Sequence, residues 1–147
     1  FEVPEIEDEE PYQIGKAKIR KKGSDITLVS YSKTMLTVLE AAKQLEDAGI
    51  SAEVIDLVTL SPWDKETVLE SVKKTGHLCI CHEAVKQGGF GAEIAATAEE
   101  EAFDSLKGPV LRLAAPFTPV PFAPSMENKV RVHVDDIVNA ITKTLKG

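Results

Sequence analysis

Short apolar runs alternate with amphipathic segments along most of the chain. The runs at 26–31 (ITLVSY), 52–57 (AEVIDL) and 78–81 (LCIC) are rich in branched apolar residues and have the length of buried strands. The segments between them repeat apolar positions every three or four residues, which is typical of helices packed on one face. Strands are therefore expected at 16–21, 26–31, 52–57, 78–81 and 110–114, and helices at 35–48, 62–75, 92–103 and 134–145.

Glycine and proline residues support these boundaries. Gly49 and Gly76 directly follow two expected helices, where a left-handed residue commonly ends a helix. Pro62 is expected to open the second helix, because proline is tolerated in a first turn. Strands alternating with helices favour right-handed crossovers and a parallel sheet covered on both faces. The sequence therefore predicts an α/β fold, a three-layer doubly wound sandwich with a mostly parallel sheet of about five strands.

The amino-terminal segment differs in composition from the rest of the chain. Residues 1–15 hold Pro4, Pro11 and a run of acidic residues, and we interpret them as an acidic linker. Segment 16–21 alternates apolar and basic residues, as expected of a half-exposed edge strand. The 147 residues suffice for one ordinary core, so 16–147 is predicted to be a single domain.

Composition and charge narrow the classes of function. The chain is 43% hydrophobic and 28% charged, and no apolar run approaches the ~18 residues of a membrane span. The net charge is -7, and no basic stripe offers a footprint for nucleic acid. Cys79 and Cys81 should point the same way from a strand, where a mutual disulfide is geometrically poor. We therefore expect an intracellular, reducing location, with neither nucleic acid nor membrane as a partner.

The polar, glycine-rich stretch after residue 81 is the first candidate site. In open α/β sheets ligands gather beyond the carboxyl ends of strands, where this stretch is expected to form a loop. The histidine could shuttle a proton, or it could fix the loop or an interface through a hydrogen bond. The glycines could admit an anion or serve close packing, since the full dinucleotide pattern is missing. The candidate subunit interface or active-site-edge loop comprises His82, Glu83, Gly88, Gly89, Phe90 and Gly91.

A proline-rich stretch is the second candidate. Four prolines between 116 and 124 remove backbone donors and fix φ, which predicts a stiff loop and no regular helix or central strand. Its two phenylalanines would either dock on a protein partner at small entropic cost or pack on the chain's own core. The candidate partner-docking residues are Phe117, Pro119, Pro121 and Phe122.

The sequence offers no catalytic constellation. Its serines lack the G-x-S-x-G elbow of nucleophilic hydrolases. His77 and His133 have no second ligand at metal spacing. Catalytic, cofactor-binding and metal-binding residues are accordingly not predicted within this chain.

Six short motifs lie in register along the chain: 14–17 (IGKA), 23–29 (GSDITLV), 53–57 (EVIDL), 61–64 (SPWD), 74–77 (KTGH), and 82–84 (HEA) with 88–94 (GGFGAEI). With these motifs the chain resembles the C-terminal domain shared by transketolases and the beta subunits of 2-oxo acid dehydrogenase first components. Their order and spacing are most similar to the beta subunits, and the match covers nearly all of the chain. Phe117 departs from the pattern, because many such relatives carry an acidic residue there.

The resemblance implies a role in a multisubunit enzyme that uses thiamine diphosphate and Mg. The N-terminal half of such a beta subunit binds the aminopyrimidine of the cofactor, the alpha subunit binds its diphosphate, and residues 1–15 would link to that missing half. The present domain would join the alpha subunit and a second beta subunit, and would help seat the subunit-binding domain of the dihydrolipoyl acyltransferase. The assembly would oxidatively decarboxylate a 2-oxo acid and acylate a lipoyl group, whereas the isolated domain should bind no cofactor and be inactive.

Two other functions stay open at this point. A stand-alone flavodoxin-like module could hold a nucleotide or anion at 88–91, and a purely structural domain could dimerise through its apolar helices. For an interface we expect the loop after Cys81 and the helix 92–103, whose alanines permit close backbone approach. The motifs 82–84 and 61–63 look like those of branched-chain or acetoin-type relatives, without fixing the substrate. The resemblance implies that the protein is located in the cytoplasm of a bacterium or in the matrix of an organelle.

Overall fold

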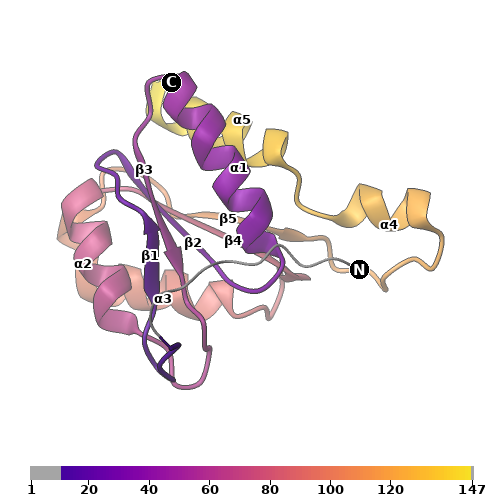
Figure 1. The fold of residues 1–147 in the computed structure, drawn as a ribbon, viewed down its shortest axis with the longest axis horizontal. Helices are drawn as coiled ribbons and strands as arrows, with labels where there is room; N and C mark the ends of the chain where they lie inside the picture. Colours follow the sequence, from indigo (N-terminus) through magenta and orange to yellow (C-terminus); the bar gives the residue numbers. More distant parts are fainter. Residues whose placement is uncertain (1–10, 147) are drawn as a thin grey trace.

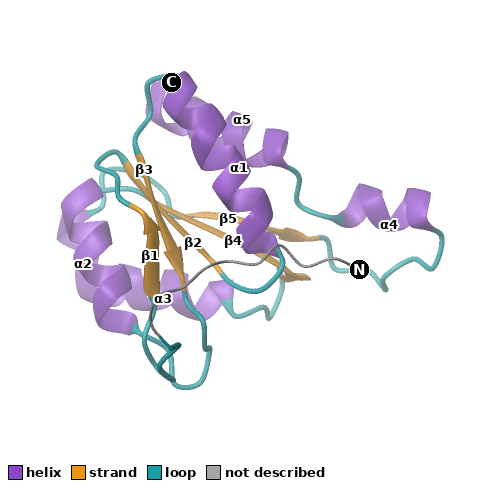
Figure 2. Ribbon diagram, viewed as in Figure 1, coloured by secondary structure: helices purple, strands orange, loops and turns teal. Residues whose placement is uncertain are grey.

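The computed structural model describes residues 11–146, which form a five-stranded sheet between two layers of helices (Figures 1 and 2). The strands are β1 (Lys18–Lys21), β2 (Ile26–Ser30), β3 (Ala52–Asp56), β4 (Leu78–Val85) and β5 (Leu111–Ala115). The helices are α1 (Thr34–Asp47), α2 (Lys65–Thr75), α3 (Gly91–Ala102), α4 (Pro124–Val130) and α5 (Val134–Lys146), with a 3-10 turn η1 (Phe103–Ser105) after α3.

The sheet has the strand order β1-β3-β2-β4-β5. β1 runs antiparallel to β3 at one edge, and the pairs β2–β3, β2–β4 and β4–β5 are parallel. The chain winds from β2 through α1 to β3, and then returns through α2 to β4 on the other side of β2. The predicted doubly wound sandwich is thus confirmed, and the expected edge strand is β1. The winding direction reverses between β2 and β4, which is where open α/β folds bind ligands.

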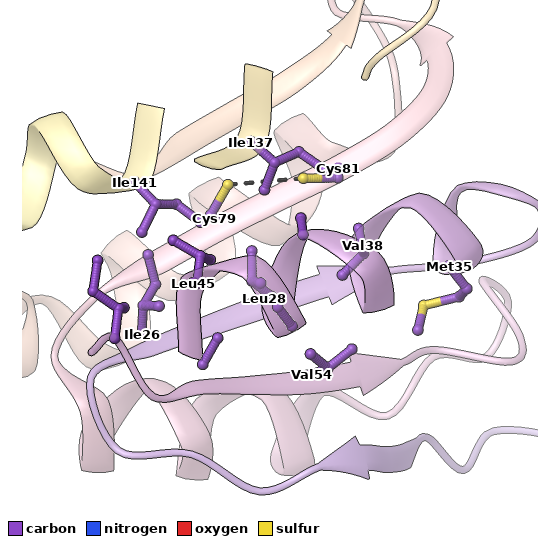
Figure 3. Packing of buried hydrophobic residues seen from close by; sticks show 14 residues of the cluster. Ile26, Leu28, Met35, Val38, Leu45, Val54, Cys79, Cys81, Ile137 and Ile141 are labelled. Carbon is purple, nitrogen blue, oxygen red and sulfur yellow. Dashed lines mark hydrogen bonds between the residues drawn. The ribbon is translucent and has the colours of Figure 1, made fainter. Parts of the chain in front are cut away.

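One hydrophobic core lies between the sheet and the pair α1 and α5 (Figure 3). Leu28 and Val54 project from the strands toward Leu45 of α1, and Ile137 and Ile141 of α5 complete the layer with no exposed surface. Burying an apolar side chain of this size contributes about 1.5–3 kcal/mol to the stability of the folded state. The spacing of the two isoleucines, four residues apart, therefore fixes which face of α5 meets the sheet.

A second core lies on the opposite face of the sheet, under α2 and α3. Ile55 and Ile80 project from β3 and β4 toward Val72 of α2 and Ile94 of α3, and all four are fully buried. Because successive strand residues point to opposite faces, β3 supplies Val54 to one core and Ile55 to the other. The continuous apolar runs of the sequence follow from this two-sided burial.

The second helix begins three residues later than the position predicted for it. Pro62 lies outside the helix, and α2 starts at Lys65 because Asp64 caps it by accepting from Thr67 N over 3.3 Å. The same carboxylate accepts from Ala17 N over 3.1 Å, which ties the residue before β1 to the start of α2. Gly76 ends the helix in the left-handed conformation, with φ of +79°, as its sequence position predicts.

Two boundaries in the second half of the chain differ from the predictions. β4 does not end at Cys81 but continues to Val85, and it pairs His82 with Ala114 of β5, so the expectation that His82 begins a loop is wrong. The segment 116–123 lacks regular structure, but α4 starts at Pro124, which occupies the first turn where proline is tolerated. The predicted stiff loop is therefore shorter than expected.

The remaining sequence predictions concern the cysteines and the amino terminus. Cys79 and Cys81 point to the same face of β4 with their Sγ atoms 3.8 Å apart, both buried and both free, as expected (Figure 3). Of the predicted linker 1–15, residues 1–10 lie outside the described part, so that assignment stays a prediction. No helix within residues 11–146 combines the length and apolarity needed to cross a membrane.

Candidate functional site

His82 lies near the carboxyl end of β4 and is completely buried. Its Nδ1 donates to Ala84 O over 3.0 Å, and its ring stacks on Tyr31 with the centroids 6.0 Å apart. Nε2 has no hydrogen-bond partner among the described residues. Burial lowers the pKa of His82, the hydrogen bond to Ala84 opposes this, and the charge of Arg112 lowers the pKa further. The ring is therefore neutral near pH 7 and held in one orientation.

Two glycines of the candidate loop pack against this ring. A Cβ on Gly91 would lie 2.5 Å from His82 Nε2, and a Cβ on Gly89 would lie 2.3 Å from Val85 O and 2.8 Å from His82 Cε1. Close-packed interiors do not tolerate such approaches, so both positions require glycine. Gly88 has φ of +73° and faces open space. This arrangement favours close packing over anion binding as the role of Gly89 and Gly91.

Phe90 closes the loop against a second aromatic residue. Its ring meets Trp63 edge to face, with the centroids 5.9 Å apart, and both side chains are half-buried. They border an open depression of about 620 Å³ whose lining is Trp63, Gly88, Gly89, Phe90, Ala92 and Glu93. This surface offers aromatic edges for packing, and its role as a subunit interface, together with α3, stays a prediction.

Glu83 is separated from its sequence neighbour His82 by the alternation of the strand. Its side chain is exposed and lines a cleft of about 220 Å³ together with Thr34, Arg131 and His133. The cleft lies between the first turn of α1 and the segment that leads into α5. The sequence grouped His82 and Glu83 in one candidate site. In the structure the side chain of His82 is buried, whereas that of Glu83 lines the cleft.

The second candidate, the proline-rich stretch, stands apart from both cores. Phe117 is 72% exposed, and Phe122 is fully exposed, so neither packs on the chain's own core. Val120 and Met126 are also exposed, and no residue of α4 is buried. Figure 1 shows α4 away from the sheet and the other helices. We call residues 116–130 the apolar arm; its docking role stays a prediction.

Sequence reasoning missed several contacts that organise these sites. The stacking of Tyr31 on His82 joins the ends of β2 and β4, and only their neighbouring positions in the sheet bring them together. Glu53 of β3 is buried and paired with Lys74 of α2, although AEVIDL reads simply as a strand. These residues are distant in sequence, and no local pattern signals them.

Both the sequence and the fold are similar to those of known proteins. A family model described as transketolase, C-terminal domain, matches residues 15–137. The chain belongs to this family. The resemblance carried by the six motifs is thereby confirmed, over nearly the whole of the described chain. The transketolase C-terminal domain is thus the fold whose loops, cleft and apolar arm are described above.

Two curated relatives indicate the subfamily. The pyruvate dehydrogenase E1 component subunit beta of Dictyostelium discoideum is 42% identical over 142 residues, covering 95% of this chain and 40% of the relative. The 2-oxoisovalerate dehydrogenase subunit beta of the same organism is 49% identical over 121 residues, covering 82% and 32%. The chain therefore spans less than half the length of the curated relatives it matches. Both are mitochondrial proteins, and bacterial beta subunits are similar as well.

A solved structure is similar in three dimensions. The split gene transketolase described as an inactive beta4 tetramer superposes with a TM-score of 0.83 at 31% identity, covering 98% of this chain and 46% of that one. These relatives and the family imply enzymes that depend on thiamine diphosphate. The described residues hold no cluster of three or more His, Cys, Asp or Glu, and the His82 ring fills the space beside Gly89 and Gly91.

Proposed function

We propose that this chain is the C-terminal, subunit-joining domain of the beta subunit of a 2-oxo acid dehydrogenase first component. The full assembly would oxidatively decarboxylate a 2-oxo acid and pass the acyl group to the lipoyl group of a dihydrolipoyl acyltransferase. Its thiamine diphosphate and Mg would be held by the alpha subunit and by the N-terminal half of the beta subunit. The similarity to beta subunits over 95% of this chain supports the assignment.

The apolar arm is the observation that carries the assembly role. Four of its side chains, Phe117, Val120, Phe122 and Met126, are each at least 56% exposed. Several exposed large apolar side chains within one short segment are a mark of a protein interface. Prolines 116, 119 and 121 stiffen the segment, so ordering it on a partner costs little conformational entropy. The arm is therefore suited to bury its phenylalanines in a neighbouring subunit.

We assign the arm to the contact with a second beta subunit. The solved relative is described as a beta4 tetramer, so a chain of this fold associates with its own kind in that protein. The alpha subunit and the acyltransferase's subunit-binding domain would occupy other surfaces, including the aromatic depression around Phe90 and Trp63. Two free, buried cysteines, Cys79 and Cys81, suit a reducing location, either bacterial cytoplasm or an organelle matrix.

The alternatives identified from the sequence have less support. A flavodoxin-like nucleotide module would use the glycines of this loop to approach its ligand, whereas Gly89 and Gly91 pack against the buried ring of His82. A purely structural dimerisation domain would use the same arm but would be independent of an alpha subunit. Association with a matching alpha subunit therefore separates that alternative from the proposal.

The test replaces two arm side chains and compares a matched control. Sedimentation over a concentration series should show self-association of the wild-type chain and a weakening of about tenfold or more in Phe117→Ser/Phe122→Ser, since buried aromatic anchors dominate such interfaces. Ile14→Ser is the control, because Ile14 is 80% exposed but lies outside the arm and outside the expected interface helix. Identical sedimentation of the wild type and both variants would overturn the assignment of the arm to a beta–beta contact.

A further inference from the structure

We infer that the cleft between α1 and α5 binds a phosphate group carried by a small molecule. The cleft lies beside the carboxyl ends of β2 and β4, where the winding of the sheet reverses. Its volume of about 220 Å³ leaves room for a phosphate and a few further atoms. This site is separate from the glycine loop, it meets the apolar arm only at Asn128, and it does not depend on the proposed function.

The first supporting feature is the amino terminus of α1. The helix spans Thr34–Asp47, has no side-chain cap at Lys33 and carries no acidic residue in its first turn. Helices α2 and α5 differ, because Asp64 caps α2 and Asp136 accepts from the backbone N–H of His133 at the start of α5 over 2.9 Å. Helix α3 also lacks a side-chain cap, but it carries Glu93 in its first turn. No carboxylate within the first turn of α1 offsets the partial positive charge there, which favours an anion at this end of the helix.

The second, independent feature is the hydroxyl of Thr34. Thr34 is one of the residues that line the cleft, it is only 4% exposed, and its buried Oγ1 has no hydrogen-bond partner among the described residues. A second hydroxyl without such a partner, Ser30 Oγ, lies at the end of β2 just before the same turn. Buried hydroxyls are normally satisfied, so an unpaired one beside a cleft points to a missing acceptor. A phosphate oxygen would accept the hydrogen bond from Thr34.

The charged residues around the cleft are of both signs. Arg131 and Lys33 supply permanent positive charge, and Arg131 also pairs with Glu127. A guanidinium has five donors, so this pair leaves others for a phosphate. Glu83 also lines the cleft, and its carboxylate would repel the anion. Removing the charge of Glu83 should therefore strengthen the binding of phosphate.

The binding experiment titrates the chain with inorganic phosphate and follows the backbone amide resonances of residues 33–37. We expect saturable shifts that sodium chloride at the same ionic strength does not reproduce. Glycerol 3-phosphate serves as the second probe, and tighter binding of the ester than of inorganic phosphate would identify an organic phosphate as the ligand. Absence of saturable shifts with both probes, or equal shifts with chloride, would overturn the inference.

Four variants test the named groups. Thr34→Val should weaken phosphate binding about tenfold, the value of a hydrogen bond to a charged group, without lowering the stability of the free protein, because the hydroxyl lost has no partner. Arg131→Gln should weaken binding, whereas Lys146→Gln, with the same charge change at the far end of α5, should not. Glu83→Gln should tighten it. Equal effects of Arg131→Gln and Lys146→Gln, or unchanged affinity in both Thr34→Val and Arg131→Gln, would show that the cleft is not the site.

Discussion

At the scale of single residues, His82 determines which side chains its neighbours can carry. Its ring is completely buried, is oriented by the bond from Nδ1 to Ala84 O, and stacks on Tyr31. Gly89 and Gly91 leave the space that the ring fills. The motif HEA followed by GGFG can therefore be understood as one packing unit, in which the histidine and the glycines depend on each other.

This dependence predicts a coupled pair of substitutions. Gly91→Ala should destabilise the chain by about 1–3 kcal/mol, because the new methyl group would meet His82 Nε2 and Ile80 Cγ2 in a close-packed core. In the background His82→Ala most of this cost should disappear, since the ring that the methyl displaces is gone. Urea unfolding of the two single variants and the double variant measures the coupling. Additive losses in the double variant would mean that the ring is not what excludes a side chain at position 91.

At the scale of elements, an ion pair between a buried carboxylate and a half-exposed lysine joins β3 to α2. The side chain of Glu53 is 3% exposed and pairs with Lys74, while Gly23 N donates to the same carboxylate over 3.4 Å. Burial alone would raise the pKa of Glu53, but hydrogen bonds from Lys74, Ser71 and Gly23 and the Lys74 charge outweigh it, so the pKa is lowered. The ion pair between Glu53 and Lys74 thus holds α2 against the sheet, and the buried carboxylate depends on the lysine for its charge partner.

Lys74→Gln should therefore destabilise the chain at neutral pH by about 1–3 kcal/mol, because it leaves a buried carboxylate without its cation. A carboxyl whose pKa is lowered by folding adds stability above its unfolded pKa of about 4.3, and this is lost as the pH falls through the folded value. The difference in unfolding free energy between the wild type and Lys74→Gln should accordingly shrink as the pH falls below about 4.3. Unfolding free energies at neutral and acidic pH measure this difference, with the exposed neighbour Lys73→Gln as control. A difference of equal size at both pH values would refute the role of the Glu53 charge.

Most of the helices and strands could be predicted from the sequence. Apolar periodicity was sufficient for the five strands and for α1, α2, α3 and α5, because two-sided burial and amphipathic faces leave local patterns. It failed at the end of β4, where the polar His82 and Glu83 suggested a loop, although pairing with β5 continues the strand to Val85. It also missed α4, because the run of prolines hides a helix that starts at Pro124. The first error comes from pairing between distant strands, which a local pattern does not contain.

At the scale of the whole molecule, both faces of the sheet are covered, and the apolar arm between β5 and α5 exposes four large apolar side chains. Figure 2 shows this segment reaching away from the layered body. The four prolines and two aromatic residues of this segment predicted Phe117, Pro119, Pro121 and Phe122 as docking residues, and the exposure of both phenylalanines is consistent with that role. Periodicity alone could not locate it, because docking on a partner and packing on the core leave the same sequence pattern.

The docking role also concerns the acyltransferase. Calorimetric titration of the chain with the subunit-binding domain of a matching dihydrolipoyl acyltransferase should give saturable binding, whereas the C-terminal domain of a transketolase, which shares the fold, should give none. Because we assign the arm to a second beta subunit, Phe117→Ser/Phe122→Ser should retain this binding if the two surfaces are distinct. Loss of binding in that variant would mean that the arm serves both contacts. Absence of binding by the wild-type chain would contradict a docking surface contained in this domain, and the domain's role would then be the joining of subunits alone.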